Sequence, residues 1–226
     1  MRSIGFKAAL LTILSISFTA CSGFPIYIAA PIEARVVDAE SGQPIEGANI
    51  VAAWHLEKSS LDGARHVGYL EVMETVTDAN GQFSFPGFTK TNATWGELRN
   101  EDPAVVIFKP GYKAVRVTND HPGNTAAGTS TVAAVNGKTV HLVKLNMDYS
   151  DKNARWYWAV DTLIPNLIED CEWKKIPRAI LAMDKELKRV DKINSWLNIG
   201  LPAIEQIEGV KGRCGSAAAF FRDYTP

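Results

Sequence analysis

The side chains that most often carry catalytic or metal chemistry are sparse in this chain of 226 residues, and their spacing matches no common catalytic motif. None of the patterns His-x-x-Glu, Gly-x-Ser-x-Gly or Ser-x-x-Lys occurs, so the usual zinc-hydrolase and serine-hydrolase signatures are missing. The four histidines lack metal-ligand spacing, although His55 and His141 fall in predicted strands and could meet in space. We therefore expect a protein that is not an enzyme, with no catalytic residue, no metal and no cofactor.

Composition and charge exclude several other classes of protein. Apolar residues make up 46% of the chain and charged residues 22%, which is ordinary for a globular protein and unlike a disordered, collagen-like or coiled-coil chain. The formal net charge is −1, so no basic field is present to hold nucleic acid.

The first of three cysteines, Cys21, follows a segment that is typical of an export signal. Arg2 and Lys7 precede thirteen uncharged residues, a run too short for a bilayer, which needs roughly 20. We assign residues 1–20 to a signal peptide. The sequence Phe18-Thr19-Ala20-Cys21 resembles the bacterial lipoprotein signal, which implies acyl chains (diacylglycerol, palmitate) on Cys21. The alternative is ordinary cleavage after Ala20, with Cys21 a free or paired thiol.

Lipidation would make the membrane the first partner of this chain, through its lipid anchor. Two or three acyl chains suffice for stable anchoring, at about 0.8 kcal/mol for each buried methylene. The resemblance implies the outer membrane of a Gram-negative cell, because Ser22 rather than Asp follows the cysteine. We assign residues 21–31 to a tether between the lipid and the folded part.

The other two cysteines, Cys171 and Cys214, are predicted to form a disulfide. Export places the chain in an oxidising compartment, where a remaining pair of cysteines normally bonds. The closed loop would hold 44 residues, for which the chain-entropy estimate is roughly 4 kcal/mol. Two buried free thiols are the alternative.

The middle of the chain, residues 32–146, has the pattern of a β-sandwich. Short apolar runs alternate with turn chemistry, for example at Asp78-Ala79-Asn80-Gly81, which is typical of a hairpin turn. Seven such runs are predicted as strands: 32–37, 48–54, 69–77, 82–85, 105–108, 114–118 and 139–145. Two long connections, 89–102 and 119–137, interrupt the pattern, and each is either a functional surface or a mobile loop.

Three motifs in this region resemble the carboxypeptidase regulatory-like domain family. They are the segment from Val36 to Ile50 with Asp38, Ser41-Gly42-Gln43-Pro44 and Gly47-Ala48, the hairpin Thr77-Asp78-Ala79-Asn80-Gly81-Gln82-Phe83, and Lys109-Pro110-Gly111-Tyr112-Lys113. The resemblance covers about half of the chain. It implies a seven-stranded, transthyretin-like β-sandwich that is not catalytic. The motif residues themselves are expected to serve turns and core.

The last part of the chain, residues 147–226, is predicted to add two or three helices, so the fold class is mainly β with a helical C-terminal piece. One apolar stripe has steps of 4, 3, 4 and 4, and a second has steps of 4, 3, 4 and 3. Pro165 predicts a break near Thr162, and Pro177 suits the first turn of the second helix. The stripes are Trp156, Val160, Leu163, Leu167, Cys171 and Ile176, Ile180, Met183, Leu187, Val190.

Aromatic residues supply the candidates for ligand contact. Trp95 lies in the 89–102 connection, and Trp158 belongs to a tryptophan-rich cluster in the helical part. Such residues either fill a core or form an exposed surface for a glycan, a peptide or a partner protein. The sequence predicts an exported, lipid-anchored binding or adaptor module of the envelope. A carbohydrate- or peptidoglycan-binding module is the alternative, and a hydrolase is a more distant one.

Overall fold

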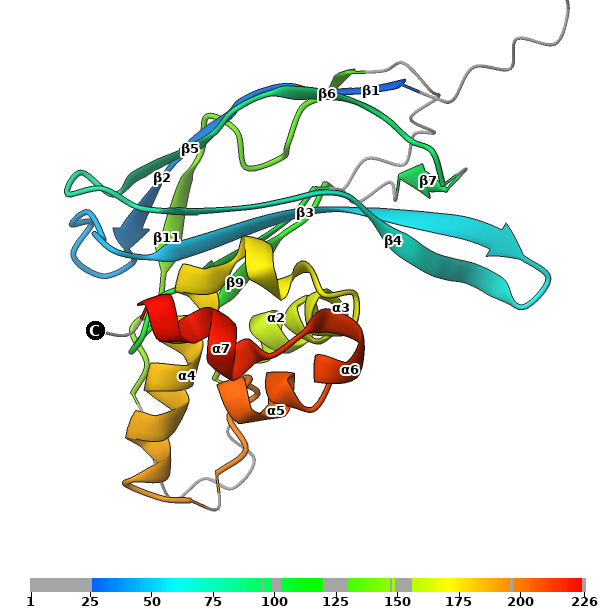
Figure 1. Ribbon diagram of the computed structural model, residues 1–226. Helices are drawn as coiled ribbons and strands as arrows, with labels where there is room; N and C mark the ends of the chain where they lie inside the picture. The colour runs from blue at the N-terminus through cyan, green and yellow to red at the C-terminus, as the bar shows by residue number, and fades with distance from the viewer. Residues whose placement is uncertain are drawn as a thin grey trace, which may run out of the picture.

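The computed structural model describes residues 26–94, 96–98, 103–119, 130–146, 148, 156–195 and 197–224. Strands dominate the first two thirds of the chain and helices the last third, so the fold is mainly β with C-terminal helices (Figure 1). The strands are β1 (Ile26–Ala29), β2 (Ile32–Asp38), β3 (Asn49–Ser60), β4 (Gly63–Val76), β5 (Gln82–Phe85), β6 (Phe88–Thr91), β7 (Glu97–Leu98), β8 (Ala104–Phe108), β9 (Val115–Val117), β10 (Ser130–Thr131) and β11 (Thr139–Leu142). The helices are α2 (Trp158–Asp161), α3 (Ile164–Glu169), η1 (Glu172–Lys175), α4 (Pro177–Asp191), α5 (Ile204–Glu208), α6 (Lys211–Cys214), α7 (Ala217–Phe221) and η2 (Arg222–Tyr224).

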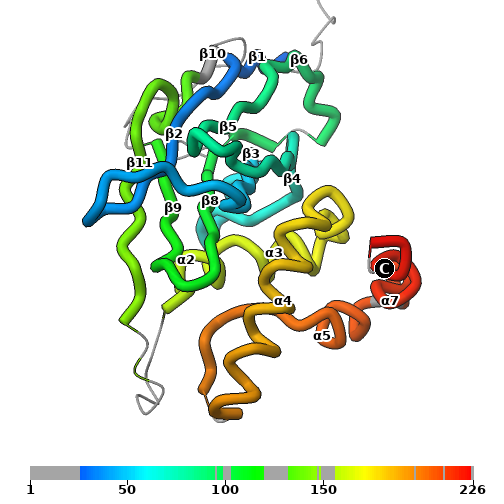
Figure 2. The backbone as a smooth tube through the Cα atoms, turned by 90° about the vertical axis from the view of Figure 1, so that its left-hand side faces the viewer, coloured from blue at the N-terminus to red at the C-terminus, as the bar shows by residue number. Residues whose placement is uncertain are grey.

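The strands form three sheets in two layers. The order β4-β3-β8-β9, with β7 also paired to β3, makes the largest sheet. The orders β10-β1-β6 and β11-β2-β5 make two smaller sheets that follow each other along one layer, above the large sheet in Figure 1. The helices cover the opposite face of the large sheet, and Figure 2 shows the same division from the side.

The two central strands of the large sheet are buried on both faces. All five residues of β8 and the first eight of β3 are buried. Alternate residues point to opposite faces of a strand, so each strand contributes to two separate cores. Ile50 and Ile107 lie in the core shared with the smaller sheets, whereas Val51 and Phe108 lie in the core shared with the helices.

The seven predicted strands correspond to β2, β3, β4, β5, β8, β9 and β11, with ends that shift by up to six residues. Four further strands were not predicted. Strand β1 lies within the segment 21–31 assigned to the tether, where it pairs with β6 and buries Tyr27 and Ala29. Strands β6 and β7 lie in the first long connection and β10 in the second.

The motif residues of the strand region close turns through hydrogen bonds. Asp38 Oδ1 accepts from the backbone N–H groups of Glu40 and Ser41 at 3.0 and 2.8 Å and from the Ser41 hydroxyl at 2.9 Å. Thr77 is buried, and its hydroxyl accepts from Ala48 N and donates to Ile45 O at 2.8 and 2.7 Å. A Cβ at Gly81 would lie 2.3 Å from the carbonyl oxygen of Val36, so only glycine fits there. These residues therefore have structural roles.

The helical part follows the predicted stripes. The first stripe breaks at residues 162–163 between α2 and α3, and Pro165 lies in the first turn of α3, as predicted. The second stripe is the buried face of α4, with Pro177 at its start, whereas α5, α6 and α7 lie beyond both stripes. No helix among the described residues has the length and apolar character needed to cross a bilayer.

A carboxylate of the large sheet caps the longest helix. The N-cap residue of α4, Ile176, has no side chain that can accept a hydrogen bond. Glu74 on β4 takes that role, because its two carboxylate oxygens accept from the backbone N–H groups of Arg178 and Ala179 at 3.1 Å each. Burial raises the pKa of Glu74, and the two amide donors act against that rise. The contact binds α4 to the sheet and satisfies two otherwise unpaired donors.

Replacing Glu74 by alanine is expected to lower the free energy of unfolding by about 1–2 kcal/mol, the usual effect of losing a helix cap. Urea denaturation followed by circular dichroism measures this change. Glu46→Ala is the control, because Glu46 is an exposed turn residue and its replacement should change stability by less than about 0.5 kcal/mol. Equal losses in the two variants would contradict the capping role.

The turn around Asp38 is expected to give the protein an acid-sensitive component of stability. The Ser41 backbone and hydroxyl donors, with further bonds from Tyr112 and Glu40, lower the pKa of Asp38 from 3.8 to about 2. A carboxylate with a lowered pKa stabilises the fold above the unfolded-state value, and this contribution is lost as the pH falls from 3.8 toward 2. Urea unfolding measured between pH 7 and pH 2 should show that wild type is more stable than Asp38→Asn at neutral pH, and that this difference in stability shrinks below pH 4. An advantage that stays constant over this range would refute the assignment.

Candidate ligand-binding site

The structure describes three of the five residues singled out from the sequence. Cys171, Cys214 and Trp158 are described, whereas Cys21 and Trp95 lie outside the described residues. The prediction of a lipid on Cys21 and that of a ligand contact at Trp95 therefore remain predictions.

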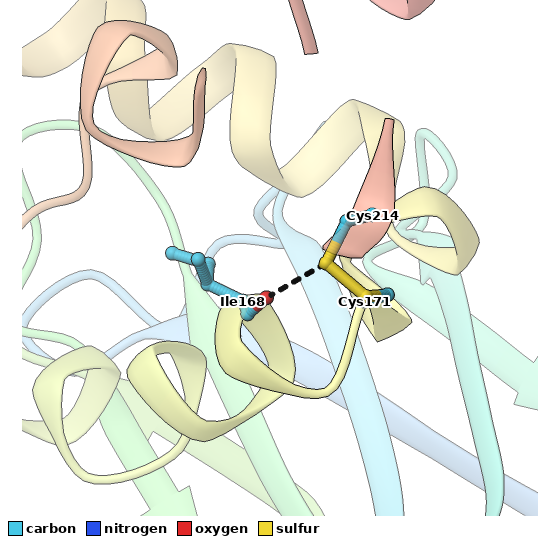
Figure 3. The surroundings of a disulfide bond; sticks show 3 residues. All are labelled: Ile168, Cys171 and Cys214. Carbon is cyan, nitrogen blue, oxygen red and sulfur yellow. Dashed lines mark hydrogen bonds between the residues drawn. A yellow bond between two sulfur atoms is a disulfide. The ribbon is translucent and has the colours of Figure 1, made fainter. Parts of the chain in front are cut away.

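The predicted disulfide is present. Cys171 and Cys214 are bonded, with their Cα atoms 5.1 Å apart and 43 positions apart in sequence. Cys171 follows α3 and has a φ of 65°, the left-handed region that closes a helix end, and Cys214 is the last residue of α6. Figure 3 shows the bond, with Cys214 Sγ 3.9 Å from the carbonyl oxygen of Ile168. The disulfide holds the C-terminal helices against α3.

The aromatic residues of the helical part divide between core and surface. Tyr157 and Trp173 are fully buried, and Tyr157 packs edge-on against Phe108 at 5.2 Å between ring centroids. Trp158, one position after Tyr157, is 55% exposed. The difference follows from geometry, because one step along a helix turns a side chain by about 100° and takes Trp158 away from the buried side.

The exposed Trp158 ring lies between two hollows in the surface. One has a volume of about 410 Å³ and separates α2 from β9, where Lys113, Thr118 and Thr162 are among its walls. The other is smaller, at about 140 Å³, and lies between Trp158, Asp161 and the segment 198–200. Gly200 has a φ of +73° there, and its N–H donates to Asn198 Oδ1 at 3.2 Å, which sets the shape of this segment.

At this site the apolar face of the Trp158 indole lies beside polar groups that include both hydrogen-bond donors and acceptors. The indole face can cover the apolar face of a ring-shaped ligand, and the indole N–H is a donor. Asp161 supplies acceptors, Asn198 an amide, and Thr118 and Thr162 hydroxyl groups. A flat ligand with many hydroxyl groups matches such a surface, since small sites orient their ligands through a few well-placed polar groups around an apolar contact.

The histidines do not meet as the sequence suggested. His55 faces His66 and Tyr69, at ring-centroid distances of 6.1 and 4.8 Å, whereas His141 lies on β11, in a different sheet. His66 Nε2 lies 2.5 Å from Asp170 Oδ2, which ties the β3–β4 hairpin to the end of α3. Within the described residues, no group of three or more His, Cys, Asp or Glu could hold a metal ion.

The surroundings of Trp158 were not predictable from the sequence. Asp161 and Asn198 are 37 positions apart and come together only because the segment 197–203 folds back along α2. Trp158 falls outside the stripe on which Val160, Leu163 and Leu167 are fully buried, but Tyr157 also falls outside it and is buried, so the stripe alone does not single out Trp158.

Comparison with known proteins gives no family assignment. No protein-family model matches the chain, and no curated protein matches it. Among solved structures, the C-terminal domain of the shaft pilin spaA from Lactobacillus rhamnosus GG is 13% identical with a TM-score of 0.24, covering 53% of this chain and 98% of that one. A 9R-lipoxygenase from Cyanothece PCC8801 is 11% identical with a TM-score of 0.26, covering 82% of this chain and 26% of that one. Likenesses this low carry no argument about function.

Removing the disulfide is expected to destabilise the protein by up to about 4 kcal/mol, because the bond restricts a long loop of the unfolded chain. Thermal denaturation of wild type and of the double variant Cys171→Ser/Cys214→Ser, each with and without a thiol reductant, measures the effect. The reductant should lower the melting temperature of wild type and leave the double variant unchanged. A wild-type protein that is insensitive to complete reduction would contradict this role.

Proposed function

We propose that this chain is a non-enzymatic binding module of a bacterial envelope, held at the outer membrane by a lipid on Cys21. The N-terminal sequence supports export and lipidation. The disulfide between Cys171 and Cys214 agrees with an oxidising compartment outside the cytoplasm.

We also propose that the strand region is a transthyretin-like sandwich of the carboxypeptidase regulatory-like type. Its support is the order of the three motifs and the match between seven predicted strands and β2, β3, β4, β5, β8, β9 and β11. The turn-closing roles of Asp38, Thr77 and Gly81 also agree with a scaffold whose motifs serve structure rather than chemistry.

The ligand that suits the surface best is a carbohydrate, such as a cell-wall or surface glycan. The observation that carries this choice is the exposed Trp158 ring between two hollows with hydroxyl, amide and carboxylate groups. An adaptor role toward an envelope protein is the second candidate, because an exposed tryptophan is also a frequent anchor of protein interfaces. Trp95, in the 89–102 segment, is the other tryptophan for which we propose a ligand contact.

Binding to a glycan array and to insoluble peptidoglycan tests the carbohydrate assignment. Trp158→Ala should weaken binding at least about tenfold, or about 1.4 kcal/mol, whereas Trp158→Phe should retain part of it because a ring remains. Ile193→Ala is the matched control, since Ile193 is similarly exposed, at 52%, and should bind like wild type.

The two candidate ligand classes give different results. Glycan binding that is lost in Trp158→Ala supports the carbohydrate module. No glycan binding, together with a specific envelope protein crosslinked in cells by wild type but not by Trp158→Ala, would replace it with the adaptor. Trp95→Ala belongs in the same series, and a loss confined to that variant would move the site to the 89–102 segment.

A further inference from the structure

A second surface feature, away from Trp158, is a groove between α4 and the turn that follows β8. Its volume is about 1170 Å³. One wall is formed by Gly47, Asn49 and the segment 109–111, and the other by the outer face of α4. Tyr224, near the end of the described chain, completes it.

The outer face of α4 carries a basic stripe. Leu181, Lys185, Lys188 and Lys192 follow one another at steps of 4, 3 and 4, so they share one side of the helix. Leu181 and Lys192 are eleven positions apart, which is about 16 Å along the helix axis. The three lysines span seven positions, so the groove presents cations over about two helical turns.

The acidic residues of the groove are already neutralised. Asp184 Oδ2 forms an ion pair with Lys188 Nζ at 2.9 Å. The two carboxylate oxygens of Glu186 accept hydrogen bonds from the Arg189 guanidinium at 2.7 and 2.8 Å. Five cations and two carboxylates line the groove, although the whole chain has a formal net charge of −1.

Three of the cations form no ion pair with a carboxylate among the described residues. Lys185 and Lys192 form no ion pair with a described residue, and Lys109 Nζ donates to the carbonyl oxygen of Glu46 at 2.6 Å, which leaves its charge uncompensated. The groove thus has a local excess of positive charge available to a ligand.

The wall of the groove is fixed by a buried network. Glu186 is 2% exposed, and its Oε1 accepts from the Tyr157 hydroxyl at 2.7 Å. The same hydroxyl oxygen accepts from Gly111 N at 3.2 Å, so it connects α4 to the turn after β8. Burial and the Glu186 carboxylate raise the pKa of Tyr157, which keeps it protonated as a donor. Both walls are therefore held in place before any ligand arrives.

Apolar surface runs between the charges. Leu181 and Ala182 are half-buried on α4, Pro110 lies opposite them, and Tyr224 is 47% exposed. A basic groove with an apolar strip is the complement of an amphipathic segment whose apolar side is flanked by carboxylates.

We propose that this groove binds an acidic amphipathic helix of a partner protein. Lys185 and Lys192 lie two turns apart, so they would face carboxylates of a helical ligand at a similar spacing. Leu181, Pro110 and Tyr224 would cover its apolar side. The site would make the chain a connector between such a partner and whatever Trp158 binds, but the groove is independent of the carbohydrate proposal.

Fluorescence anisotropy with a defined peptide tests the proposal. The probe is a labelled 14-residue amphipathic peptide with leucines on one face and glutamates beside them, and its counterpart carries lysines in place of the glutamates. Wild type should bind the glutamate peptide and not the lysine peptide, with affinity falling as salt increases. Lys185→Glu/Lys192→Glu should weaken binding at least tenfold.

The control has the same change in net charge at other positions. Lys58→Glu/Lys138→Glu reverses two exposed lysines that do not line the groove, and it should bind the peptide within about twofold of wild type. Trp158→Ala should also bind it normally, which separates this test from that of the carbohydrate site. Thermal denaturation checks that all variants are folded.

Several outcomes would overturn the proposal. One is equally weakened peptide binding in the two double variants, which would show that binding depends on the overall charge of the protein rather than on the groove. Others are equal binding of the lysine peptide, or no peptide binding while anionic phospholipid vesicles bind through Lys185 and Lys192. Concentration-dependent dimerisation that is lost in Lys185→Glu/Lys192→Glu would assign the groove to a second copy of the chain instead.

Discussion

Burial of the central strands on both faces is the constraint on which the rest of the structure depends. Strands β3 and β8 place large apolar side chains on each side of the large sheet, so a single covering layer would leave Val51 and Phe108 in water. The smaller sheets cover one side and the C-terminal helices cover the other. The helical part is therefore a layer that covers one face of the sheet, and its packing positions both proposed binding surfaces.

Polar and covalent links help to hold that layer in register, and the hydrogen bond from Gly111 N to the Tyr157 hydroxyl is one of them. Glu74 caps α4 from β4, the His66–Asp170 pair joins the β3–β4 hairpin to α3, and the Cys171–Cys214 bond joins α3 to α6. Each link connects segments that are at least 43 residues apart in sequence. These links are directional whereas apolar burial is not, so they favour one orientation of the helices on the sheet. The position of Trp158 beside β9 depends on that orientation.

The sequence was most informative where a local pattern decides the structure. Turn chemistry and alternation located seven strands, and the 3.6-residue period together with Pro165 and Pro177 located α2, α3 and α4 and the break between α2 and α3. Strands β1, β6, β7 and β10 were missed, because β1 lies in the segment assigned to the tether and the other three lie within the two long connections. The surroundings of the two proposed binding surfaces were not predicted from the sequence either. Each combines residues from the strand region with residues from the helices, and no local pattern encodes that pairing.

Under the proposed lipidation of Cys21, the early start of β1 would limit the distance between the folded part and the membrane. Only four residues separate Cys21 from Ile26, and an extended chain spans at most about 3.6 Å per residue, so the standoff from an acylated Cys21 is no more than about 18 Å. Strand β3 alone has 12 residues and, at about 3.3 Å per residue, is about 40 Å long. The protein would therefore stay close to the lipid surface rather than move at the end of a long tether. The layer containing β1, β6 and β10 would then face the bilayer, while α4 and α5, at the opposite side in Figures 1 and 2, would point away from it. Partners would approach from the aqueous side, and ligands embedded in the same leaflet would be out of reach of the helical layer.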